Sequence, residues 1–491
     1  MTELNDLRLL LASRYPIILI ETWDEPRALS VLRRIAMEQA LPIFSWTITD
    51  GLRREELIDA PAQKNNADPI AMLGQVRGTK EAGIYALCDI HPFLKDDPKI
   101  VRLMKEIALR HEEVGHTLVL ISHALDLPPE LQRLCARCEL SMPDETQLLS
   151  IVQDEARGYA KRTGQRVRTD RASLEKVVRN LRGATHEDAR RLARGAIVDD
   201  GAITDTDLAE VNKAKFNLMD MESVLSYEYD TAQFSQVGGL NGLRGWLMKR
   251  EQAFTGSPGA LDAPRGILLV GVQGGGKSLA AKAVAGMWHL PLLRFDMGAV
   301  YNKFFGESER NVREALRLAE TMSPCVLWID EIEKGIASGD NDGGTSRRVL
   351  GTLLTWMAER KSPVFLVATA NQIADLPPEL IRKGRFDELF FVDLPDATIR
   401  HEIFRIHLDK RKQDATTFDL GLLAELSEGF TGAEIEQAVV AALYSAQAAE
   451  MMLEDAHLCD ELRSTVPLSV TMAESLAALR QWCSTRAVPA N

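Results

Sequence analysis

The residues with the clearest chemistry in this chain are the eight from Gly271 to Ser278, which read Gly-Val-Gln-Gly-Gly-Gly-Lys-Ser. Successive glycines let several backbone N–H groups point at one anion, and a following helix N-terminus adds a partial positive charge. In such a cradle the lysine reaches the outer phosphates and the serine hydroxyl can bind magnesium. The segment predicts a site for ATP and Mg²⁺, formed by Gly274, Gly275, Gly276, Lys277, Ser278 and Leu279.

Two adjacent acidic residues that could take part in catalysis, Asp330 and Glu331, follow the apolar run Cys325–Ile329. Such a run is typical of a buried strand. The strand that precedes the phosphate cradle is predicted at Ile267–Val270, and parallel neighbours bring their carboxyl ends to one edge of a sheet. We therefore expect Asp330 to bind the magnesium shell and Glu331 to polarise the attacking water, as phosphoryl transfer requires.

Further motifs resemble the AAA+ ATPases of the classical clade. The stretch Val237–Leu240 precedes the cradle, Asn371 follows the apolar run Val364–Ala368, and Leu380–Asp387 carries two arginines. The resemblance implies an α/β fold of P-loop AAA+ modules, in which a parallel sheet flanked by helices is followed by a helical lid.

More narrowly, the chain resembles an uncharacterised AAA family that was first named as a chloroplast reading frame and also occurs in bacteria. Three features carry this resemblance: Gln273 where most relatives have proline, the strand Cys325–Ile332, and Leu376–Leu380 running into Arg382–Arg385. The close match covers residues 230–450, roughly half of the chain. Lys383 departs from the proline that is usual at this position in the family.

The resemblance also implies individual roles. Asn371 would be the sensor that touches the γ-phosphate and the lytic water, while Arg382 and Arg385 would be arginine fingers that act on a neighbouring subunit's nucleotide. Activity would then require a homo-oligomeric ring, expected to be a hexamer. Residues expected to contact the nucleotide outside the cradle are Val237, Gly238, Gly432 and Ala433, the last two from the second sensor of the lid.

The segment Tyr301–Glu309 matches the first pore loop of the family. In relatives that translocate polypeptides, an aromatic side chain of this loop projects into the central channel and grips the substrate. Phe304 or Phe305 would be that side chain here, and a location of one or both in the core is the alternative.

The first 210 residues repeat features of the rest of the chain at a nearly constant offset. Leu127–Leu131 returns as Leu376–Leu380, and Leu87–Asp89 matches Trp328–Asp330, roughly 250 residues apart. We infer an internal duplication whose first copy is degenerate. Carboxylates and a proline in Glu21–Arg27 replace the phosphate cradle, and Ile90 replaces the catalytic glutamate, so this copy is expected neither to bind nor to cleave ATP.

The predicted organisation is a degenerate AAA-like module at 1–205, a linker at 206–235, an ATPase subdomain at 236–398, and a lid with a C-terminal helix at 399–491. A last helix after Thr471 is expected to fold back on the lid. A net charge of −13 disfavours nucleic acid as a partner, and no apolar run is long enough to span a membrane. Six cysteines without framework spacing fit a cytoplasmic location, or a stromal one in a plastid.

These observations predict an ATP-hydrolysing AAA+ motor that remodels a protein substrate or adaptor, whose identity the residues do not reveal. Two alternatives stay open. One is a regulatory switch or scaffold that changes shape without threading a chain, and the other is a nucleic-acid remodeller.

Overall fold

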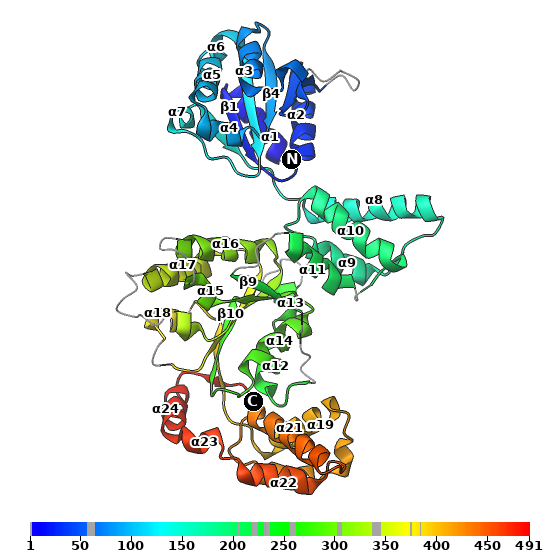
Figure 1. Ribbon diagram of the computed structural model, residues 1–491, viewed down its shortest axis with the longest axis vertical. Helices are drawn as coiled ribbons and strands as arrows, with labels where there is room; N and C mark the ends of the chain where they lie inside the picture. The colour runs from blue at the N-terminus through cyan, green and yellow to red at the C-terminus, as the bar shows by residue number, and fades with distance from the viewer. Residues whose placement is uncertain are drawn as a thin grey trace. The chain divides into compact units, whose positions relative to one another are not determined.

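The computed structural model describes residues 2–55, 64–204, 207–218, 224–229, 231, 236–255, 262–301, 307–335, 345–373, 376–382 and 384–491. The chain divides into two compact units (Figure 1), one of residues 1–154 and 184–191, the other of residues 155–183 and 192–491. Among the described helices, none is long and apolar enough to cross a membrane.

The first unit is built on a six-stranded sheet in the order β3-β2-β4-β5-β1-β6. Every neighbouring pair is parallel except β2 and β3. Ile17 and Leu19 of β1 pack in one apolar cluster, and Ile18 and Ile20 pack in another, so the sheet is buried on both faces. The strands are β1 (Ile17–Glu21), β2 (Ile43–Thr47), β3 (Gly51–Arg54), β4 (Gly83–Cys88), β5 (His116–Ser122) and β6 (Cys135–Cys138). The helices are α1 (Thr2–Ala12), α2 (Glu25–Gln39), α3 (Pro69–Gly78), α4 (His91–Asp96), α5 (Pro98–Leu109), α6 (His111–Val114) and α7 (Pro129–Gln132).

The second unit contains a seven-stranded sheet in the order β15-β14-β10-β13-β12-β11-β9. Alternate residues of β10 again belong to two apolar clusters, because helices cover both faces of the sheet (Figure 1). The strands are β9 (Leu225–Glu228), β10 (Gly266–Gly271), β11 (Leu292–Phe295), β12 (Cys325–Ile329), β13 (Val364–Ala370), β14 (Glu388–Val392) and β15 (Val488–Pro489). The helices of this part are α12 (Asn241–Met248), α13 (Glu251–Thr255), α14 (Lys277–Trp288), α15 (Met297–Tyr301), α16 (Glu307–Thr321), α17 (Thr345–Glu359) and α18 (Pro378–Ile381).

The two sheets confirm the predicted tandem modules. The parallel strands β2-β4-β5-β1-β6 of the first unit occur in the same spatial and chain order as β11-β12-β13-β10-β14 of the second, and each sheet adds an antiparallel strand at the same edge. The likeness extends to side chains, since Asp89 accepts a hydrogen bond from Ser122 at 2.9 Å as Asp330 does from Thr369 at 2.7 Å.

The first unit has carboxylates where the second has its glycine-rich turn. Asp24 caps helix α2 by accepting from the backbone N–H of Arg27 at 3.1 Å, so the side chain itself supplies the anion at this helix N-terminus. Glu21 is held by Arg137 at 2.9 Å and by the N–H of Leu125 at 3.1 Å. That this module binds no ATP stays a prediction, and these contacts give it a physical reason.

The lid is a helical cluster with its own apolar core, formed by α19 (Ala397–Lys410), α20 (Leu420–Leu426), α21 (Gly432–Ala448) and α22 (Asp455–Ser464). After the short helix α23 (Leu468–Thr471), α24 (Ala473–Cys483) does not fold back on this lid. Cys483 is buried in the core of the large ATPase subdomain, with Leu479 and Trp482 packed against it, and β15 pairs with β14. The prediction that the last helix folds back on the lid is therefore wrong. The apolar side chains of α24 pack against the core of the large ATPase subdomain instead.

Four helices follow the first sheet: α8 (Glu145–Thr163), α9 (Arg171–Asn180), α10 (His186–Asp200) and α11 (Asp207–Leu218), with the short strands β7 (Arg168–Thr169) and β8 (Ala202–Ile203). The sequence predicts a linker over 206–235, but this range contains α11 and strand β9, which pairs antiparallel with β11. Apolar residues of this segment, among them Phe216 and Leu225, join the ATPase core, which is why the segment is folded.

Lys215 of α11 is 1% exposed and donates hydrogen bonds to the carbonyls of Asn180, at 3.1 Å, and Arg182. Burial lowers the pKa of Lys215 to about 7. The pKa in the folded protein is then below the ordinary value, so the unfolded chain binds more protons above pH 7 and folding stability rises with pH.

We expect Lys215→Met to lower the free energy of unfolding at pH 7 by roughly 1–3 kcal/mol, because two buried carbonyls lose their donor. Between pH 7 and the ordinary lysine pKa, the wild type should gain up to about 1.4 kcal/mol per pH unit relative to the variant. Urea unfolding of both proteins at several pH values measures this difference. Parallel pH profiles would contradict a buried, titrating Lys215.

Candidate active site

The glycine-rich turn joins β10 to α14 in the manner of a phosphate cradle. Gly274 and Gly276 have φ values of 77° and 93°, a region that residues with a Cβ rarely adopt. Space is also restricted, since a Cβ on Gly271 would lie 2.1 Å from the carbonyl oxygen of Val392. The positive φ values therefore favour glycine at positions 274 and 276, and a turn of this kind before a helix N-terminus is suited to binding an anion through backbone N–H groups.

Lys277 begins α14 and is 6% exposed. Its Nζ donates to the carbonyl oxygens of Gly271 at 2.9 Å and Val272 at 2.7 Å, within the cradle itself. Burial lowers the pKa of Lys277 to about 8, although Glu333, Asp330 and Glu331 oppose the shift. The ammonium group is thus desolvated and donates to two neutral carbonyl oxygens. A phosphate oxygen could take the place of these acceptors and would add a charge-assisted hydrogen bond.

Asp330 lies where β12 ends and connects three neighbouring side chains. Its Oδ1 accepts from Thr369 at 2.7 Å and from Ser278 at 3.4 Å, and its Oδ2 lies 3.8 Å from Arg294. Thr369 in turn accepts from the backbone N–H of Glu331 at 2.9 Å. The predicted pair of magnesium ligands, Ser278 and Asp330, is therefore brought together as two oxygen donors.

Glu331 has a φ of 49° and turns its carboxylate to the residues that follow β13. Oε1 accepts from Nδ2 of Asn371 at 2.8 Å, and Oε2 pairs with Nζ of Lys334 at 2.5 Å. The backbone N–H of Asn371 donates to Glu333 at 2.8 Å. The residues predicted as general base and sensor, Glu331 and Asn371, are thus in direct contact.

A cavity of about 910 Å³ joins these residues to the lid. The N–H of Ala433 in α21 donates to the carbonyl of Gly274 at 3.2 Å, and a Cβ on Gly274 would lie 3.1 Å from both Ala433 and Thr431. Thr431 and Glu434 form a capping box, which fixes the start of α21 beside the cradle. The predicted residues that line the cavity are Val237, Gly238, Gly274, Gly275, Gly276, Lys277, Ser278, Leu279, Asp330, Glu331, Asn371, Gly432 and Ala433.

The two predicted arginine fingers do not line this cavity. Arg382 is exposed, and Arg385 is partly buried and donates to the carbonyl of Leu354. Arg382 instead lines a second cavity of about 1180 Å³ between α24 and the end of the sheet.

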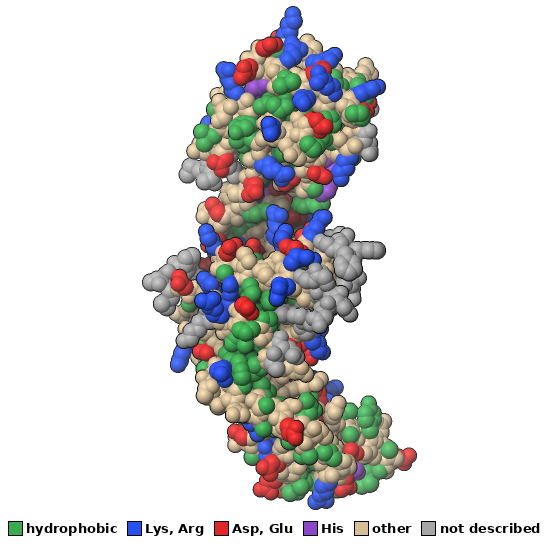
Figure 2. Space-filling view, turned by 90° about the vertical axis from the view of Figure 1, so that its left-hand side faces the viewer, with side chains coloured by type: hydrophobic (Ala, Val, Ile, Leu, Met, Phe, Trp, Pro, Cys, Tyr) green, Lys and Arg blue, Asp and Glu red, His purple; other side chains and the backbone are tan. Residues whose placement is uncertain are grey.

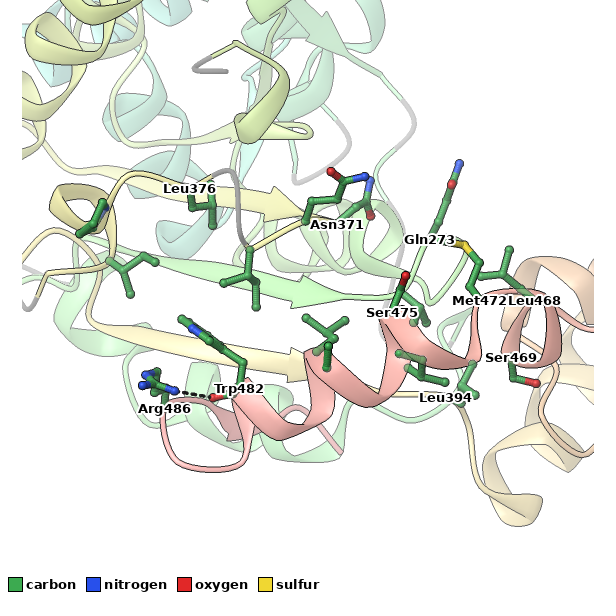
Figure 3. A pocket seen from close by; sticks show the side chains of 18 of the residues that line it. Gln273, Asn371, Leu376, Leu394, Leu468, Ser469, Met472, Ser475, Trp482 and Arg486 are labelled. Atoms are coloured by element: carbon green, nitrogen blue, oxygen red, sulfur yellow. Dashed lines mark hydrogen bonds between the residues drawn. The ribbon is translucent and has the colours of Figure 1, made fainter. Parts of the chain in front are cut away.

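Figure 3 shows this second cavity, with Trp482 and Met472 on the side of α24 and Leu376 opposite them. Asn371 and Gln273 line both cavities, so the two spaces adjoin at these residues. The space-filling view presents the side of the second unit that carries α18 and α24, and hydrophobic side chains form a strip on it (Figure 2).

Several lining residues were not predicted from the sequence. Thr369 could have been predicted from the alternation of side chains along a strand. It lies two residues before Asn371, so the two side chains are expected on the same face of the sheet. Ile403 and His407 lie four apart on α19 and line the cavity from the lid; burial lowers the pKa of His407. The predicted pore residues Phe304 and Phe305 lie outside the described residues.

Family models match three segments of the chain. Residues 267–394 match the ATPase family associated with various cellular activities (AAA), and residues 3–140 and 146–222 match the N-terminal and second domains of SpoVK-like AAA ATPases. Together with the two sheets and the cradle, these matches define an AAA ATPase with tandem AAA-type domains, which binds and hydrolyses ATP.

More particularly, the chain belongs to the family of the uncharacterized AAA domain-containing protein ycf46. It is 36% identical to that protein of Trieres chinensis over 98% of this chain and 96% of the relative. It is also 36% identical to that of Guillardia theta over 99% and 95%. A shorter match of 193 residues, at 42% identity, links it to the proteasome-activating nucleotidase of Aeropyrum pernix, over 38% of this chain and 47% of the relative.

Proposed function

We propose that this ATPase remodels protein substrates as a ring of six copies, using the energy of ATP hydrolysis. The observation that supports the proposal is the convergence of Lys277, Asp330 and Glu331 in one cavity that residues of the lid helix α21 also line. A protein as the substrate is supported by the partial match to the proteasome-activating nucleotidase, a relative whose name refers to another protein assembly.

In this proposal the cradle N–H groups and Lys277 bind the triphosphate, while Val237, Gly238, Gly432 and Ala433 contact the rest of the nucleotide. Ser278 and Asp330 are oxygen donors 3.4 Å apart, which fits the preference of Mg²⁺ for oxygen ligands. Magnesium held there would neutralise phosphate charge. The bound nucleotide would also bridge the sheet and the lid, so that its hydrolysis changes their relative position.

Glu331 takes the proton of the attacking water, and Asn371 orients both the carboxylate and the γ-phosphate. The contact of 2.8 Å between these two side chains supports a shared role. Arg382 and Arg385 stabilise the charge that develops on a neighbouring copy's nucleotide, which is why the active form is a ring.

The variants Phe304→Ala and Phe305→Ala test whether one of these side chains grips a polypeptide in the central channel of the ring. A chemically unfolded polypeptide should stimulate ATP hydrolysis by the wild type, because a gripped chain loads the motor. At least one of the two variants should keep the basal rate and lose the stimulation. The measurement is steady-state phosphate release with and without the unfolded polypeptide.

Tyr15→Ala provides a matched control, because it removes an aromatic side chain that is 40% exposed in the first unit. It should retain both the basal rate and the stimulation. Stimulation that persists in both phenylalanine variants would overturn threading and favour a switch. Stimulation by RNA or DNA instead of polypeptide, weakening steeply with salt, would favour a nucleic-acid remodeller.

A further inference from the structure

The segment Val488–Asn491 returns from α24 to the rim of the nucleotide cavity. Val488 and Pro489 pair in parallel with β14, and the N–H of Ala490 donates to the carbonyl of Phe391 at 2.9 Å. The carbonyl of Ala490 accepts from the N–H of Leu243 in α12 at 2.9 Å, and Ala490 is fully buried. Backbone hydrogen bonds to β14 and to α12 therefore fix the position of the chain just before Asn491.

The side-chain amide of Asn491 has a defined orientation. Its Oδ1 accepts from the backbone N–H of Leu240 at 2.6 Å. Since that group can only donate, the accepting atom must be the oxygen, and the NH₂ group occupies the other branch of the amide. Asn491 lines the nucleotide cavity, and its Nδ2 has no hydrogen-bond partner within the described part of the chain.

The end of the cavity near Asn491 differs from the end at the cradle. Val237 is 4% exposed, and Ile399 and Ile403 of the lid are each 9% exposed, so this end has apolar walls. A Cβ on Gly238 would lie 2.7 Å from Ile403, and one on Gly239 would lie 2.8 Å from Oδ1 of Asn491. The narrow apolar walls suit a flat aromatic base, whereas the N–H groups and Lys277 suit phosphates.

We infer that Asn491 is a base-binding residue, whose Nδ2 donates a hydrogen bond to an acceptor nitrogen of the adenine ring. The inference rests on the proposed binding of the triphosphate by the cradle, which directs the base to the apolar end. The amide is held in place before the nucleotide arrives, so little side-chain entropy is lost on binding. One neutral hydrogen bond of this kind changes affinity by about three- to tenfold.

The test uses Asn491→Asp in the full chain. A carboxylate can still accept from the N–H of Leu240 but cannot donate to the base, so the change removes the proposed contact and adds one negative charge, which the control variant and the tripolyphosphate measurement take into account. Asn241→Asp is the matched control, since Asn241 is exposed, adjoins Leu240 and does not line the cavity. Calorimetry measures the binding of Mg·ATP, and of inorganic tripolyphosphate as a ligand without a base.

We expect Asn491→Asp to weaken ATP binding about three- to tenfold and to leave tripolyphosphate binding unchanged, while Asn241→Asp alters neither. Unchanged ATP affinity in Asn491→Asp would overturn the inference, and so would an equal loss for tripolyphosphate or an equal effect of Asn241→Asp. Lys277→Ala distinguishes a failure of this inference from a failure of the proposed function. If Lys277→Ala abolishes the binding of both ATP and tripolyphosphate while Asn491→Asp has no effect, the proposed function stands and the role of Asn491 is excluded.

Discussion

Replacing Glu331 with glutamine should lower the rate of ATP hydrolysis by about 10²- to 10⁴-fold and leave ATP binding intact. Glutamine has the same size and can still accept from Asn371, which donates to Glu331 at 2.8 Å, but it cannot take a proton from water. Single-turnover hydrolysis reports the chemical step, and calorimetry reports binding. Lys277→Ala should instead lose binding, because the ammonium group is removed from the cradle.

Glu333→Gln is the matched control for Glu331→Gln. It removes the same charge two residues later, at a side chain that is 5% exposed and does not line the nucleotide cavity. Glutamine at 333 can still accept from the N–H of Asn371, so turnover should stay close to that of the wild type. Equal losses in the two variants, or a loss of ATP binding in Glu331→Gln, would contradict the assignment of Glu331 as the base.

The second large effect is expected on the turnover of ATP when Arg382 or Arg385 is replaced. Arg382→Ala and Arg385→Ala should each lower turnover by about 10³-fold while ATP affinity is retained, because the guanidinium stabilises the transition state rather than the bound ATP. Neither side chain lines the chain's own nucleotide cavity, so we expect each to act on the nucleotide of a neighbouring copy. Phosphate release and ATP binding at equal protein concentrations measure the two quantities.

Mixing variants tests the contribution between copies directly. In an equal mixture of Arg385→Ala and Glu331→Gln, about a quarter of the head-to-tail interfaces combine an intact Glu331 with an intact Arg385. Activity should then recover to about a quarter of the wild-type rate, although each variant alone is inactive. The control mixture replaces Glu331→Gln with the double variant Glu331→Gln/Arg385→Ala, which supplies no finger and should restore nothing. Absence of recovery in the first mixture would place Arg385 outside the active site.

Much of the candidate site could be predicted because its residues lie in local motifs. A glycine-rich turn between a strand and a helix has few possible geometries, and acids at the end of a parallel strand lie at the same edge of the sheet as that turn. The structure accordingly brings Lys277, Ser278, Asp330 and Asn371 into one cavity. The repeated motifs likewise predicted a second sheet, because a duplicated sequence of strands and helices buries its apolar residues in the same way.

Other features depended on contacts between distant segments. The position of α24 could not be predicted, since an apolar helix face fits the lid or the sheet equally well in sequence terms, and the lid core is filled by other helices. The range 206–235 has the composition of a linker, yet β9 completes the edge of the ATPase sheet. Strand pairing at a sheet edge depends on which backbone groups remain unpaired, which no local pattern reveals.

The sequence by itself determined the class of chemistry and the degeneracy of the first module's cradle, because each depends on residues close together in the chain. It did not determine the strand order, since β10 and β12 were expected to be neighbours and β13 lies between them. Only the tertiary structure decided that Arg382 and Arg385 lie outside the chain's own cavity, that Lys215 is buried among carbonyls, and that Asn491 reaches Leu240. Those features arise where segments far apart in sequence pack together, and packing depends on complementary shape and burial across the whole unit.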